Sequence, residues 1–184
     1  MNVFLKVLLN AVSLTIVWLV ALAVVLLVAQ VSAQVPTATA AAGGTALVTL
    51  HAEGAQIYQC KPDSDGKSPS QKSALTWQFR EPIATLMLDG KSVGRHYAGP
   101  NWDHIDGSGA KGKVLASTPG ATPNDISWLK LAVADHRGDG ILSNATMVER
   151  INTKGGLAQG SCEHEGDYRS VPYSADYVFL RKLD

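Results

Sequence analysis

Alternation of apolar and polar residues with a period of two constrains this sequence more than any other feature. The pattern runs through residues 75–79, 84–88 and 128–134. Because successive side chains of a strand point to opposite faces, each run predicts a half-buried β-strand. The residues expected to face the core are Leu75, Trp77, Phe79, Leu86, Leu129, Leu131 and Val133.

Turn signals separate these runs, with Asp-Gly pairs at residues 89–90, 106–107 and 139–140. Asp-Gly between two strand patterns favours a β-hairpin. Residues 123–128 are expected to form at most one helical turn, and no convincing helix follows residue 44. The whole pattern predicts an all-β domain of about nine or ten short strands, either an antiparallel β-barrel or a β-sandwich. Further strands are expected at residues 46–51, 56–60, 91–97, 111–117, 141–151 and 175–180.

The amino-terminal segment predicts export. A single lysine, Lys6, precedes an almost wholly apolar run at residues 7–29, and small residues follow at Val31 and Ala33. This order describes a signal peptide over residues 1–33, cleaved after Ala33. The apolar run is also long enough to cross a bilayer of about 30 Å, so the alternative is an uncleaved membrane anchor. Both alternatives place the domain outside the cytoplasm. Residues 7–29 are expected to contact the membrane only if the signal is not cleaved.

The rest of the chain divides into a linker and one domain. Residues 34–44 (QVPTATAAAGG) are low in complexity and have no apolar period, so they are expected to form a linker. Residues 45–184 are long enough for a single β-rich domain with its own core. Lys and Arg number 16 against 16 Asp and Glu, and this balance argues against a nucleic-acid partner, which requires clustered positive charge.

Two cysteines, Cys60 and Cys162, lie in the expected domain. Two cysteines in an exported domain predict one disulfide, since oxidising compartments favour the bridge. The alternative is a pair of buried free thiols. A bridge closing a loop of roughly a hundred residues would stabilise the fold by about 4–5 kcal/mol on the chain-entropy model.

Residues 93–107 (VGRHYAGPNWDHIDG) hold the densest set of chemically versatile side chains. Gly99-Pro100 is expected to break the strand and to place residues 101–104 on a rim. Aromatic walls with a few polar groups are typical of small-molecule sites, so a small molecule or a glycan is the expected ligand. The alternative is structural, with Trp102 closing one end of the core. The candidate ligand-binding residues are His96, Tyr97, Trp102, Asp103 and His104.

Catalytic and cofactor signals are weak in this sequence. His96, Asp103, His104 and His136 have side chains that bind metals, but their spacing matches no standard motif, and no metal site is predicted. No Gly-x-Ser-x-Gly nucleophile turn and no glycine-rich phosphate loop is present. We therefore predict no cofactor and assign no catalytic residue.

Seven blocks follow one another along the chain. They are residues 55–60 (AQIYQC), 74–79 (ALTWQF), 96–102 (HYAGPNW), 126–131 (ISWLKL), 150–156 (RINTKGG), 160–162 (GSC) and 171–177 (VPYSADY). In this order they resemble the DUF3455 family, a group of exported domains of unknown function. The resemblance extends over residues 43–181 and implies a single exported domain, with Cys60 and Cys162 in the two cysteine-bearing blocks. It transfers no catalytic residue.

Three functions remain open: a ligand-binding module, a structural envelope or surface protein without a ligand, and, less favoured, a histidine- or metal-dependent enzyme.

Overall fold

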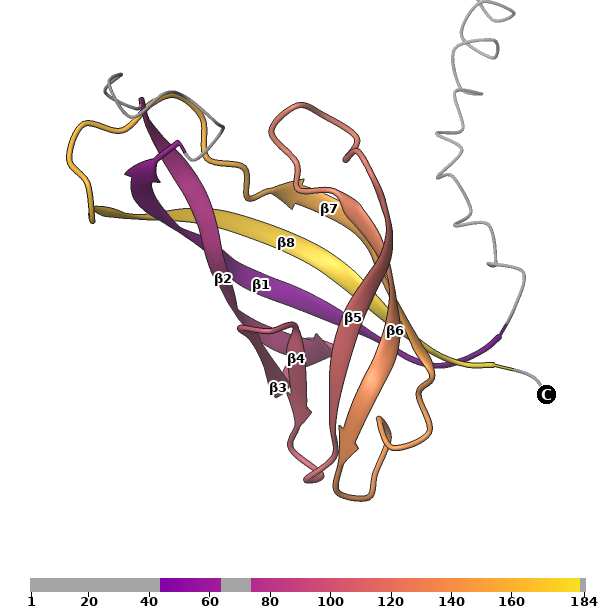
Figure 1. Ribbon diagram of the computed structural model, residues 1–184. Helices are drawn as coiled ribbons and strands as arrows, with labels where there is room; N and C mark the ends of the chain where they lie inside the picture. The colour runs from indigo at the N-terminus through magenta and orange to yellow at the C-terminus, as the bar shows by residue number, and fades with distance from the viewer. Residues whose placement is uncertain (1–43, 64–73, 183–184) are drawn as a thin grey trace, which may run out of the picture. The chain divides into compact units, whose positions relative to one another are not determined.

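The computed structural model describes residues 44–63 and 74–182, and this part of the chain is a closed antiparallel β-barrel (Figure 1). Each strand pairs with the next, and β8 pairs with β1 to close the ring. The all-β prediction is confirmed, and of its two alternatives the barrel is the one found. The strands are β1 (Thr45–Pro62), β2 (Leu75–Leu88), β3 (Lys91–Tyr97), β4 (Asn101–His104), β5 (Gly109–Thr118), β6 (Trp128–Arg137), β7 (Met147–Gly155) and β8 (Tyr168–Arg181).

The amino-terminal predictions lie outside the described residues, both the export signal or anchor at residues 1–33 and most of the linker at 34–44. Within residues 44–63 and 74–182, no helix has the length and apolar character needed to span a membrane.

The barrel has eight strands where the sequence predicts nine or ten. Two pairs of the nine predicted ranges are continuous, and β4 at residues 101–104 is a strand that the sequence pattern did not predict. Residues 46–51 and 56–60 both belong to β1, and residues 75–79 and 84–88 both belong to β2. At Gly54, a Cβ atom would lie 2.0 Å from the carbonyl oxygen of Ile83. The glycine therefore lets the two strands approach closely inside the ribbon, and it does not mark the end of a strand.

The β3–β4 hairpin is shorter than the strands on either side of it. β3 pairs with β2 only along residues 84–88, and β4 pairs with β5 only along residues 109–111. Figure 1 shows β2 and β5 diverging beyond this hairpin. The barrel wall is thus hydrogen-bonded all the way round over only part of its height.

This gap in the wall explains one error in the predicted core. Leu86 and Leu131 are buried as expected, and Leu129 and Val133 pack against the core. Leu75 and Trp77 are only half-buried. Phe79 is 55% exposed, and its part of β2 has no β3 neighbour.

At one end of the barrel, Asp106 holds the loop before β7 by hydrogen bonds. The predicted strand at 141–151 begins only at Met147, and the preceding residues form a loop whose Leu142 side chain is buried. Asp106 Oδ2 accepts a hydrogen bond from the Ile141 amide at 2.9 Å, and its Oδ1 accepts the Ser108 hydroxyl at 2.6 Å. Partial burial opposes ionisation of Asp106, but these donors outweigh it and hold the carboxyl pKa well below its usual value.

At the other end of the barrel, Asp125 has a similar role. Asp125 Oδ1 accepts the Gly155 amide at 2.6 Å, and Oδ2 accepts the amide and hydroxyl of Thr122 at 2.9 and 2.7 Å. The Gly155 amide contributes most to lowering the pKa of Asp125. Residues 123–124 form a turn, so the helical turn expected at 123–128 is absent. Asp125 instead holds the β5–β6 loop against the end of β7.

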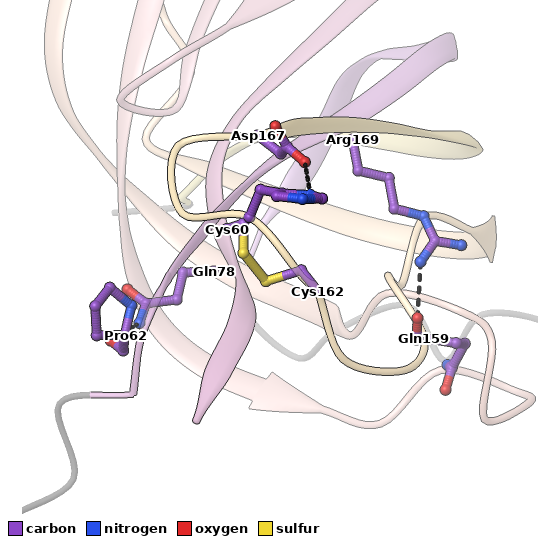
Figure 2. Close-up of a disulfide and its surroundings, with 8 residues drawn as sticks. Cys60, Pro62, Gln78, Gln159, Cys162, Asp167 and Arg169 are labelled. Carbon is purple, nitrogen blue, oxygen red and sulfur yellow. Dashed lines mark hydrogen bonds and ion pairs between the residues drawn. A yellow bond between two sulfur atoms is a disulfide. The ribbon is translucent and has the colours of Figure 1, made fainter. Parts of the chain in front are cut away.

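The predicted disulfide is present and fixes the β7–β8 loop. Cys60 of β1 is bonded to Cys162, with 5.9 Å between the Cα atoms (Figure 2). Beside the bridge, the Cys60 amide donates to the Asp167 carbonyl at 2.8 Å, and the Gly166 amide donates to the Cys60 carbonyl at 2.9 Å. The bridge and these two hydrogen bonds hold the loop against the β1–β2 ribbon.

Candidate functional site

Pairing of β3 with β4 separates the candidate residues by face. His96 lies opposite Trp102, and Arg95 lies opposite Asp103. Because side chains alternate along a strand, His96 and Trp102 point into the barrel while Tyr97 and Asp103 point outward. The five candidates therefore form no single cleft.

The inward pair belongs to the core. The His96 and Trp102 rings stack with centroids 5.0 Å apart and planes at 9°, and Tyr177 lies 4.8 Å from the His96 ring. Trp102 has no exposed surface, and His96 is 2% exposed. The rim expected for Trp102 is thus wrong, because the chain turns at 98–100 and continues directly into β4. Trp102 is a core residue of the barrel.

Burial makes His96 a neutral side chain. Its Nδ1 donates a hydrogen bond to the Asn101 carbonyl at 2.8 Å. Removal from water lowers the pKa of His96 from 6.5 to about 4, and the charge of Arg150 acts in the same direction. A histidine that is neutral, bonded and shielded from solvent is poorly placed to exchange protons with a substrate.

His104 lies apart from the other four candidates, at the end of the barrel latched by Asp106. Its Nδ1 is 3.0 Å from Asp106 Oδ1, and the side chain is mostly buried. His136, the other histidine considered as a ligand, has its Nε2 2.6 Å from the Ala145 carbonyl oxygen. In the described residues, no group of three or more His, Cys, Asp or Glu side chains is placed to hold a metal ion.

Tyr97 and Asp103, the two outward-pointing candidates, border a pocket of about 230 Å³ on the outer face of β3 to β6. Tyr97 and Asp103, both predicted from the sequence, lie in its wall. The two basic residues in that wall, Lys111 and Arg137, come from β5 and β6. The full lining is Tyr97, Asn101, Asp103, Gly109, Ala110, Lys111, Asp135, His136 and Arg137.

Asp103 is the centre of a hydrogen-bond network in this wall. Its Oδ2 accepts from Arg95 Nε at 3.0 Å and from Arg95 Nη2 at 2.9 Å. Its Oδ1 accepts from Arg137 Nη2 at 2.6 Å and from the Tyr97 hydroxyl at 3.2 Å. Partial burial disfavours the charged carboxylate, but the hydrogen bonds from the two arginines outweigh it and lower the pKa of Asp103. Asp103 is therefore an ionised anchor for two guanidinium groups.

Tyr97 has an arginine on one ring face. The Arg95 guanidinium carbon lies 5.0 Å from the ring centroid, within the range of a cation–π contact. With its ring packed by Arg95 and its hydroxyl bonded to Asp103, Tyr97 is held in a fixed orientation at the pocket. A fixed aromatic ring beside planar polar groups is the usual construction of a site for a small polar ligand.

Sequence reasoning missed the three cations of this site, Arg95, Lys111 and Arg137. Arg95 and Tyr97 are two residues apart in a strand and so share a face, which was a usable signal for Arg95. Lys111 and Arg137 reach the pocket only through the pairing of β4 with β5 and of β5 with β6.

Comparison with known proteins identifies a family whose activity is unknown. The sequence profile of the family described as "Protein of unknown function (DUF3455)" matches residues 40–181. No curated protein and no solved structure matches the chain.

Proposed function

We propose that this chain, which belongs to the DUF3455 family of proteins of unknown function, is an exported binding module. Its ligand is a small polar molecule, such as a sugar, held in the pocket on the outer face of β3 to β6. The observation that carries the proposal is the convergence of Tyr97, Asp103 and Arg137 on one pocket.

Export is supported by two independent features. The apolar run at residues 7–29 followed by small residues is typical of an export signal. The Cys60–Cys162 disulfide is consistent with an oxidising compartment outside the cytoplasm.

A thermal-shift screen of the purified protein against sugars, sugar acids and other polar metabolites tests the binding function. A ligand that binds only the folded state raises the free energy of unfolding, by about 2.7 kcal/mol at a hundredfold excess over its Kd. We expect at least one compound to raise the melting temperature, and Tyr97→Ala to abolish that rise.

Tyr168→Ala is the matched control for Tyr97→Ala. Tyr168 also carries an arginine over its ring, with Arg80 at 5.2 Å. Its hydroxyl is also hydrogen-bonded, although it accepts from Arg80 Nη1 at 2.8 Å where the Tyr97 hydroxyl donates to Asp103. It does not line the pocket. Loss of the ligand effect in both variants, or no effect of any compound on the wild type, would contradict the proposal and favour the structural envelope protein.

A further inference from the structure

We infer that the ligand of this pocket is a sugar bearing a carboxylate, a uronic acid or a saccharide that contains one. The inference rests on the proposed function, since it names the chemical class that the pocket on β3 to β6 would take. It follows from which hydrogen-bonding atoms of the pocket are already used and which are left.

The first step concerns the acceptor side of the network. Asp103 receives four hydrogen bonds, two from Arg95 and one each from Arg137 and Tyr97. An ionised carboxylate has about four lone-pair sites. Asp103 therefore has no acceptor left for a ligand hydroxyl, and its negative charge is compensated inside the wall.

The second step concerns the donors that remain. A guanidinium has five N–H donors. Arg137 uses one on Asp103 and is also hydrogen-bonded to Tyr97, and its side chain is 62% exposed, so its remaining donors are accessible to a ligand. Arg95 uses two donors on Asp103 and does not line the pocket. Lys111 adds an ammonium group that makes no ion pair within residues 44–63 and 74–182. Guanidinium and ammonium donors together favour a carboxylate, which a guanidinium can hold through two parallel hydrogen bonds.

The third step explains why the acid should also carry hydroxyl groups. Asp135 lines the same pocket, and its Oδ1 accepts a hydrogen bond from the His136 amide at 2.9 Å. Among the residues that the structure describes, none donates to Oδ2, which can therefore accept from a ligand. A free carboxylate oxygen accepts from a hydroxyl but repels a second carboxylate. The pocket thus combines the cations Lys111 and Arg137 with an acceptor at Asp135, which lies opposite Lys111 in the β5–β6 pairing. This combination matches a hydroxy acid with the Tyr97 ring beside it.

Isothermal titration calorimetry with galacturonate, its neutral counterpart galactose, and acetate tests the inference at constant ionic strength. We expect galacturonate to bind at least about tenfold more tightly than either galactose or acetate, equivalent to about 1.4 kcal/mol. Galactose lacks the carboxylate, and acetate lacks the hydroxyls, so each removes one half of the recognition.

Arg137→Gln and Lys111→Gln remove one positive charge each from the pocket. We expect each to weaken galacturonate binding by about tenfold or more and to leave galactose binding nearly unchanged. Lys113→Gln is the control, because Lys113 lies two residues further along β5, is exposed, and does not line the pocket. Two substituted positions keep the test valid if one variant fails to fold.

The possible outcomes test the acidic-sugar inference separately from the proposed binding function. Equal affinity for galacturonate and galactose, or equal losses in Lys111→Gln and Lys113→Gln, would overturn the acidic-sugar inference while a binding module remains. Acetate binding as tightly as galacturonate would overturn the sugar part. If no compound in the wider screen binds, both the inference and the proposed function fail.

Discussion

Replacing His96 with phenylalanine should remove much of the pH dependence of stability between about pH 7.5 and pH 5. His96 has a folded-state pKa of about 4 against an ordinary value of 6.5. In this window the unfolded chain binds a proton at His96 and the folded chain does not, so stability falls as the pH falls. Integrating the two titrations gives a loss of about 2 kcal/mol at pH 5, approaching about 3 kcal/mol near pH 4.

The assay is urea unfolding of the wild type and of His96→Phe at a series of pH values. Phenylalanine keeps a planar ring against Trp102 and Tyr177 but cannot be protonated, although it leaves the Asn101 carbonyl without its donor. The variant is therefore expected to be less stable at neutral pH and to have a flatter profile. Below about pH 5 the aspartates of the unfolded chain begin to bind protons while Asp106 and Asp125 of the folded chain stay ionised, so the comparison is made above that pH. Parallel profiles of unfolding free energy against pH for the two proteins would refute the argument that buried, neutral His96 causes the loss of stability between about pH 7.5 and pH 5.

Three further predictions concern the framework around the pocket. Trp102→Ala should lower the free energy of unfolding by about 3–5 kcal/mol, because the indole is fully buried; a loss below about 1 kcal/mol in urea unfolding would contradict its place in the core. Cys60→Ser should lower stability by about 2–5 kcal/mol, and mass spectrometry after alkylation without reduction should label Cys162 in this variant and neither cysteine in the wild type. Asp125→Ala should lower the melting temperature and speed hydrogen exchange at the Gly155 amide, which loses its carboxylate partner; unchanged exchange would mean that Asp125 does not hold the loop.

The turn aspartates show why simple composition can mislead a search for catalytic carboxylates. Asp106 and Asp125 are both ionised with lowered pKa values, a property often associated with active sites. Here each carboxylate accepts amide and hydroxyl groups that join a loop to a strand end. Their lowered pKa values therefore result from hydrogen bonds that hold loops in place, which agrees with the preference of turns for aspartate.

The candidate site was predictable in part. Residues 93–107 do contain Tyr97 and Asp103, which line the outer pocket. The sequence also shows that neighbours such as His96 and Tyr97 must point to opposite faces. It does not show that Gly99-Pro100 is a tight turn inside the sheet, so Trp102 was expected on a rim and lies instead in the core.

What the sequence determined by itself is local. The period-two pattern, the Asp-Gly turns and the paired cysteines are short-range or compositional signals, and the all-β class, the β2–β3 turn at Asp89-Gly90 and the Cys60–Cys162 bridge follow from them. Asp89 and Gly90 both have positive φ, as a two-residue hairpin turn of this type requires.

Closure and register were decided only by the tertiary structure. Whether two sheets pack or one sheet closes depends on the pairing of β1 with β8, whose residues are more than a hundred positions apart in the chain. The pairing of β4 with β5 and of β5 with β6 brings Lys111 and Arg137 beside Tyr97 and Asp103. No local pattern encodes these contacts, because each depends on which residue of a neighbouring strand lies opposite, and a shift of one residue would turn every side chain to the other face.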